Sequence, residues 1–400
     1  SSITALVGIT AAAISGGKVA ASGAMGVTLA RNYIGVSSKD DTSKLGHQTL
    51  AYVKDSTLNS ATDIRVDARS VERMDTDAYS GAAAIAVGIG GAASATGVEL
   101  TNFISSKTNA YLENSSAKAV GDIDVQAVSD SEITQADAVG VSVAAGAVAL
   151  SISASVSDNT IENDVQAYID NANTVQINGS TVAVMAGGDI NVKADAEKAK
   201  IADVTAVNVA ISGGSSGASG GGIDIDNIVN NNVNAEIRGN GITLALGDIN
   251  VTATETAYVG ADISNVSASF SAGAAIGVAL LNNEINSDVS AKVTNATLYS
   301  ANTAVTADGK AEIAKTTTIG VSGSMYAATG NRADASLGNT VTADVTGATL
   351  VSTNGIDISA NADIDAKAKA GGGAFGGVAV GAMIADVEAG KGTSVDEVQA

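Results

Sequence analysis

The sequence predicts an all-β protein, a parallel β-solenoid (β-helix) built from repeats of about 52–68 residues with roughly three coils each. Three observations predict it: an internal repeat, alternation of apolar and polar residues, and a composition poor in bulky side chains. The 400 residues include 45 Gly, no Pro, no Cys and no Trp, and only 3% are aromatic. Because aromatic side chains supply much of the volume of a thick core, their scarcity favours a thin, extended aliphatic core.

Two short phrases mark the repeat and recur in step along the chain. An Ala-x-aliphatic phrase begins at Ala51, Ala110, Ala167, Ala235, Ala291 and Ala343. The second phrase begins at Thr62 (TDIRVDA), Gly121 (GDIDVQA), Gly188 (GDINVKA) and Gly247 (GDINVTA). These landmarks predict an N-terminal partial repeat (1–48), a continuous solenoid array (49–390) and a polar tail (391–400) that continues into a longer chain.

The local period within each unit is two, which is the signature of β-strands. In DINVKA, for example, Ile190 and Val192 fall on one side of the strand. Asn-rich phrases and Gly-Asp pairs fit corners of a coil, where stacked Asn side chains are expected to form ladders. An array of small antiparallel sandwiches, one per unit, is the alternative architecture.

An uncharged stretch, AVGVSVAAGAVALSISASVS, runs over residues 138–157, and similar stretches recur at the same phase of the repeat. A membrane helix is rejected because the stretch is rich in Gly and Ser, alternates as strands do and lacks basic flanks. Its aliphatic residues change parity at Ala145-Gly146-Ala147, and a corner there would keep both aliphatic sets inside the coil.

The other parity of these stretches carries small, uncharged residues. The sequence predicts that they form an outward docking face, which packs laterally against another solenoid or another part of the same protein. The alternatives are an ordinary mildly polar surface, or a wider coil with both faces inside. The predicted lateral packing face comprises Gly140, Ser142, Ala144, Ser267, Ser269, Ser271 and Gly273.

Little in the sequence suggests catalysis, and we predict that the protein is not an enzyme and has no cofactor. His47 is the single histidine, and it is expected to be a solvated turn residue. Aspartates recur in phase at Asp63, Asp122, Asp189 and Asp248, which is typical of a structural role. We interpret them as turn caps; Asp122, Asp189 and Asp248 are weak candidates for Ca²⁺ ligands.

The net charge of −21 argues against nucleic acid and anionic lipid as partners, because both require clustered Lys and Arg. No membrane insertion is expected. Tyr52, Tyr111 and Tyr168 align in phase. A stacked ladder is the favoured interpretation of this column, and a glycan-binding strip is the alternative.

The phrase order, from GDINVKA through a Gly/Ala/Ser-rich segment to NxIxNxVxAxI, resembles the repeats of large bacterial filamentous adhesins, in particular leukotoxin-like filamentous haemagglutinins. The resemblance covers the chain from about Gly46 to Gly390. It implies type V secretion and display at the bacterial cell surface as a long β-helical stalk, and no catalytic residues can be carried over from such families.

The expected function is therefore that of a non-catalytic structural segment of a secreted or surface-displayed bacterial fibre, a rigid rod that packs laterally with copies of itself or with neighbouring repeats. The alternative is an adhesive module that binds a host glycan, a host protein or Ca²⁺.

Overall fold

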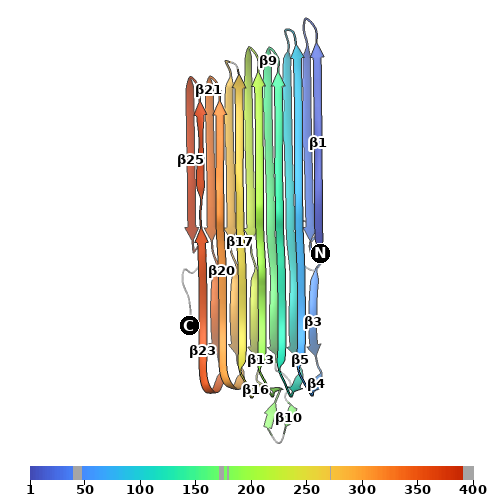
Figure 1. Cartoon of the computed structure of the whole chain (residues 1–400), viewed down its shortest axis with the longest axis vertical. Coiled ribbons are helices and arrows are strands. Elements are labelled where there is room, and N and C mark those ends of the chain that lie inside the picture. Colours follow the sequence, from blue (N-terminus) through green and yellow to red (C-terminus); the bar gives the residue numbers. More distant parts are fainter. Residues whose placement is uncertain (39–46, 171–174, 178–179, 271, 391–400) are drawn as a thin grey trace.

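The computed structural model describes residues 1–38, 47–170, 175–177, 180–270 and 272–390. Within this part of the chain there are 25 strands and no helix, and nearly all strands belong to two long parallel sheets (Figure 1). None of the described segments forms a helix long and apolar enough to cross a membrane. The predicted all-β fold class, a parallel β-solenoid, is confirmed.

The strands divide as follows. Sheet A contains β1 (Ser2–Gly16), β4 (Thr57–Ser60), β5 (Ile64–Val87), β7 (Ser116–Ala119), β8 (Ile123–Ala145), β12 (Val184–Ala186), β13 (Ile190–Gly213), β16 (Ile242–Ala245), β17 (Ile249–Phe270), β20 (Thr297–Gly323), β23 (Thr349–Ala366) and β24 (Lys369–Phe375). Sheet B contains β2 (Ala21–Ile34), β3 (Gln48–Lys54), β6 (Gly91–Glu113), β9 (Val148–Asp170), β14 (Ser216–Val229), β15 (Asn232–Arg238), β18 (Ala274–Ile285), β19 (Asp288–Thr294), β21 (Tyr326–Leu337), β22 (Thr340–Thr346) and β25 (Val378–Ala389). A small hairpin, β10 (Val175–Ile177) with β11 (Ser180–Val182), stands apart at one end.

Each repeat makes one coil, and the predicted three coils per repeat are wrong. The chain runs along sheet A, turns sharply, and returns along sheet B, as β8 and β9 do around residues 146–147. Ile123 pairs with Ile64 in the preceding repeat and with Ile190 in the following one, so neighbouring strands lie one full repeat apart. Asn residues taken for corners, such as Asn159 and Asn227, lie inside strands, which reach 27 residues in length, and this leaves fewer corners than expected. The Gly-Asp pairs lie in turns, as predicted.

The turns that join sheet A to sheet B define one end of both sheets, which we call the tip; the β10–β11 hairpin marks the opposite end, the base (Figure 1). From the base to the middle, Val, Ile, Leu and Ala fill the space between the sheets in two clusters. Ile123, Ile190 and Ile249 belong to one column of this core and are fully buried. Burial of such side chains stabilises the fold by about 1.5–3 kcal/mol each.

A ladder of asparagine side chains crosses five coils inside sheet B. The Nδ2 of each residue donates to the Oδ1 of the next at 2.7–2.9 Å, from Asn32 through Asn102, Asn159 and Asn227 to Asn283. The expected Asn ladder is thus confirmed, but it lies in the strand interior and not at a corner. Each buried amide is satisfied by its copies above and below, which offsets the cost of removing it from water.

Candidate functional site

The predicted lateral packing face lies between the two sheets and not on the outside. Ser142 and Ala144 point inward from β8 and are 0% and 1% exposed. The Ser142 hydroxyl pairs with that of Ser94 on sheet B at 2.7 Å, and Ser151 donates to the Ser142 carbonyl oxygen. These residues dock against another part of the same chain, so they are not available to a second solenoid.

Three further residues of that predicted face, Gly140, Ser267 and Ser269, also point inward. Ser267 and Ser269 are buried on β17, and a Cβ atom on Gly140 would stand 2.7 Å from Ser153 Oγ across the interior. Gly273 lies in a tip turn, and Ser271 lies outside the described residues. Small side chains are therefore what allows the two sheets to approach closely near the tip.

A β-bulge explains why the facing was predicted the wrong way round. In β8 the residues from Ile123 to Ile133 point inward at odd positions. The pairing with β5 shifts by one residue at Gln135, after which even positions point inward. Because one extra residue turns every later side chain to the other face, Val139 and Val141 point outward.

Near the tip the molecule is consequently polar or small inside and aliphatic outside. We call the outward residues of this region the apolar band. On sheet B, Leu150, Ile152 and Val156 of β9 are exposed at 43%, 46% and 38%. On sheet A, a groove of about 490 Å³ is lined by residues that include Tyr79, Gly81 and the outward valines of β8. Exposed aliphatic surface of this extent marks interaction sites on proteins.

The aspartates at the base form a ladder. The Oδ1 of Asp63 accepts the backbone N–H of Asp122 at 3.0 Å, and the same bond repeats from Asp122 to Asp189 and from Asp189 to Asp248 at 2.8 Å. Asn302 continues the ladder by donating to Asp248. The carboxylates cap the backbone of the next coil, as the turn-capping interpretation expects. Among the described residues no group of three or more His, Cys, Asp or Glu side chains gathers as a metal site; Ca²⁺ binding stays a prediction.

The tyrosine column on sheet B is a stacked ladder. The rings of Tyr52 and Tyr111 lie 5.1 Å apart, those of Tyr111 and Tyr168 lie 4.7 Å apart, and both pairs are nearly parallel. The Arg238 guanidinium covers the outer face of Tyr168 at 4.6 Å. Burial, followed by the neighbouring Tyr111, raises the pKa of Tyr168 to about 12. Because the ring faces cover one another, the column offers little surface on which a sugar could stack.

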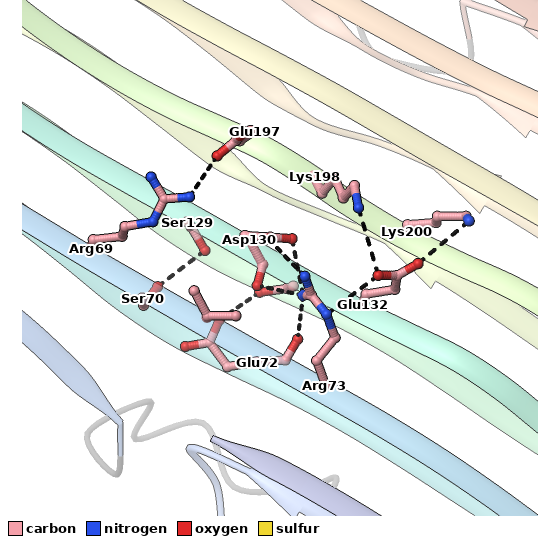
Figure 2. Close-up of polar contacts among 12 residues, drawn as sticks. Arg69, Ser70, Glu72, Arg73, Ser129, Asp130, Glu132, Glu197, Lys198 and Lys200 are labelled. Carbon is pink, nitrogen blue, oxygen red and sulfur yellow. Dashed lines mark hydrogen bonds and ion pairs between the residues drawn. The ribbon is translucent and has the colours of Figure 1, made fainter.

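A charged cluster on the outer face of sheet A joins three coils (Figure 2). Arg73 on β5 forms a bidentate pair with Asp130 on β8, with its shortest contact at 2.7 Å, and lies 3.4 Å from Glu132. Lys198 and Lys200 on β13 reach Glu132 from the other side at 3.8 and 3.4 Å. The hydrogen bond to Asp130 raises the pKa of the Arg73 guanidinium.

This cluster is a clamp between coils and not a binding pocket. Arg69 likewise reaches across to Glu197 at 3.0 Å (Figure 2). All four cations of the cluster have a carboxylate partner, so none is left to bind an anionic ligand. The cluster surrounds the bulges of β8 and β13, where the pairing register shifts and the strands need lateral support.

His47 is not the solvated turn residue that was expected. Its Nε2 lies 3.0 Å from the buried carboxylate of Glu72, whose other oxygen accepts a hydrogen bond from Ser131 Oγ at 2.9 Å. In a hydrolytic triad the histidine stands between the serine and the acid and removes the proton of the hydroxyl. Here the acid stands between them and Ser131 is fully buried, so the trio cannot activate a nucleophile.

Glu255 is a second carboxylate in the interior. Burial, the largest cause, raises its pKa from 4.5 to about 7, although the Asn231 amide donates to Oε1 at 2.7 Å. A pKa near neutrality is typical of acid–base catalysts, but the side chain is 3% exposed and does not reach a cleft. Sequence reasoning missed both buried acids because each occupies a position that is apolar or small in the other repeats.

Comparison of the chain with protein-family models, with curated proteins and with solved structures found no match. The resemblance to filamentous adhesin repeats therefore stays a prediction from the sequence phrases.

Proposed function

We propose that this chain is a non-catalytic structural segment of a secreted or surface-displayed bacterial fibre. The observation that carries the proposal is the stacking of coil on coil: equivalent residues of successive repeats pair along both sheets from one end of the array to the other, and the register shifts by single residues at the bulges. Three side-chain ladders, of Asp, Asn and Tyr, run in the same direction. Such nearest-neighbour stacking produces a stiff object whose length grows with the number of repeats.

A structural role also agrees with the chemistry of the polar groups. The His47–Glu72–Ser131 trio has the wrong order for nucleophilic catalysis, and Glu255 is enclosed. The adhesive alternative receives less support, because the tyrosine faces are stacked and the cations of the charged cluster are paired.

Two measurements test the proposal. Small-angle X-ray scattering of the full chain, extrapolated to zero protein concentration, should match a single rigid particle made of the two paired sheets; a scattering curve typical of flexibly linked units would contradict it. Antibodies raised against the chain should stain intact cells of the bacterium that encodes it as strongly as permeabilised cells. Staining that appears only after permeabilisation would overturn surface display. A cytoplasmic protein of the same bacterium, stained in parallel, is the matched control.

A further inference from the structure

The outer face of sheet B near the tip is corrugated. Strands β2, β9, β18 and β25 carry aliphatic side chains outward, and the strands between them, β6, β14 and β21, mostly carry Gly and Ala. One row of neighbouring residues across the sheet reads Met25, Ala95, Ile152, Gly220, Ile276, Ala328 and Val380. Aliphatic ridges and shallow grooves therefore alternate strand by strand.

This corrugation is complementary to itself. Strands in a sheet lie about 4.8 Å apart, so the ridges stand roughly 10 Å apart and the grooves have the same spacing. We propose that the apolar band of sheet B docks against the same surface of a second copy of this chain, with each ridge in a groove of the partner. The twofold axis runs parallel to the strands, between β14 and β18.

In this arrangement β14 of one copy faces β18 of the other, and β9 faces β21. Ile276 enters the groove at Gly220, where a side chain would meet no atom of its own chain within 4 Å. Ile152 packs over Ala328, and Leu150 packs against Tyr326, which is 53% exposed. Interdigitation of this kind resembles the dry interfaces between paired sheets.

The positions of the charged residues at the edge of the apolar band favour this position of the twofold axis over neighbouring ones. The last row of the band carries Glu99 on β6, Asp224 on β14 and Arg332 on β21, each in a groove. With the axis between β14 and β18, Arg332 lies opposite Val156 of the second copy, whose neighbours on either side are Glu99 and Asp224. Two acids thus flank the arginine across the interface, and the same contact occurs twice by symmetry.

The size of the surface also fits a second copy. Six strands about 4.8 Å apart and nine residues of about 3.3 Å each give roughly 850 Å² per copy, or roughly 1,700 Å² in total, which is the size of a standard specific interface. A lipid bilayer would fit less well, because β2 and β25, the edge strands of sheet B near the tip, pair on one side only and would bring unpaired backbone groups into hydrocarbon. The proposal does not depend on surface display of the protein.

The test is sedimentation velocity of the full chain over about 1–100 μM, compared with two variants of one design. Gly220→Ile fills a groove of the proposed interface; Gly323→Ile makes the same change on the outer face of sheet A, where a side chain also meets nothing within 4 Å. We expect the wild type and Gly323→Ile to dimerise alike, and Gly220→Ile to weaken the dimer at least tenfold, with an unchanged melting temperature at protein concentrations where the wild type is monomeric.

A charge exchange tests the axis. Arg332→Glu should weaken the dimer, and adding Asp224→Arg should recover most of the loss. A chain that stays monomeric at 100 μM, or a dimer lost on Gly323→Ile and kept on Gly220→Ile, would overturn the proposal. Co-flotation of a monomeric chain with phosphatidylcholine vesicles would also overturn the proposal, because the apolar band would then be a surface that binds lipid. Scattering extrapolated to zero protein concentration reports the rigidity of the monomeric coil stack separately, so failure of the dimer leaves the proposed function standing.

Discussion

At the scale of single residues, the most informative group is Glu255, a carboxyl enclosed among apolar and amide side chains. Its folded-state pKa, about 7, lies above the ordinary value of 4.5, because burial penalises the charged form. The folded state therefore binds the proton more tightly than the unfolded state. The stability that this group contributes is complete below about pH 4.5 and is lost as the pH rises through about 7.

The variant Glu255→Gln keeps the shape and cannot ionise. We expect its free energy of unfolding to exceed that of the wild type by up to about 3 kcal/mol at pH 8.5 and by little at pH 5. Denaturant melts at both pH values measure the difference. Glu388→Gln, at an exposed glutamate of β25, is the control and should follow the wild type. Parallel pH profiles for the wild type and Glu255→Gln would show that the carboxyl ionises freely in the folded state.

At the scale of elements, the inward facing of the small residues sets how closely the sheets pack. Gly140→Val would push a side chain against Ser153 and Asn208, whose oxygens would lie 2.7 and 3.1 Å from the new Cβ. We expect a loss of about 1–3 kcal/mol in the free energy of unfolding. The matched change Gly323→Val points outward from sheet A into open space, away from the proposed dimer interface, and should cost nothing. Equal stability of the two variants would mean that Gly140 faces solvent.

The strands near the tip also show how much of the fold the sequence could predict. The period-two pattern and the recurring phrases sufficed for the solenoid, the tip turn at Gly146, the Asn ladder and the Tyr ladder. The inside and outside of the strands near the tip could not be predicted: on β8 the answer depends on the bulge at Gln135, whereas on β9 and β17 the alternation continues unchanged and the aliphatic residues themselves move to the outward positions. In sequence the bulge is one additional polar residue, and the rule that aliphatic residues point inward then assigns the wrong face.

The tyrosine ladder offers a second prediction at this scale. Tyr111 stacks on two neighbours and Tyr52 on one. Tyr111→Ala should therefore destabilise the fold more than Tyr52→Ala, by roughly 0.5–1.5 kcal/mol for the additional ring pair. Chemical denaturation of both variants measures this difference. If the two substitutions cost the same, the additional ring pair of Tyr111 contributes nothing to the stability of the fold.

At the scale of the whole molecule, one coil per repeat makes stability a property of nearest neighbours. A central coil such as β13–β14 has a paired coil on each side, whereas β1–β2 and β24–β25 have one, and β25 is largely exposed. In a linear array, end units open at lower cost than central units, because opening an end breaks a single interface. Local opening should therefore proceed from the ends toward the centre.

Hydrogen exchange followed by mass spectrometry measures this order directly. We expect amide protection to be highest in β8, β13 and β17 and to fall toward β1 and β25, although the strands of sheet A have similar hydrogen-bond patterns. A dimer through sheet B should add protection to β14 and β18 at high protein concentration and leave the sheet A ranking unchanged. Uniform protection from end to end would mean that the coils open together, and the additive description of the solenoid would then be wrong.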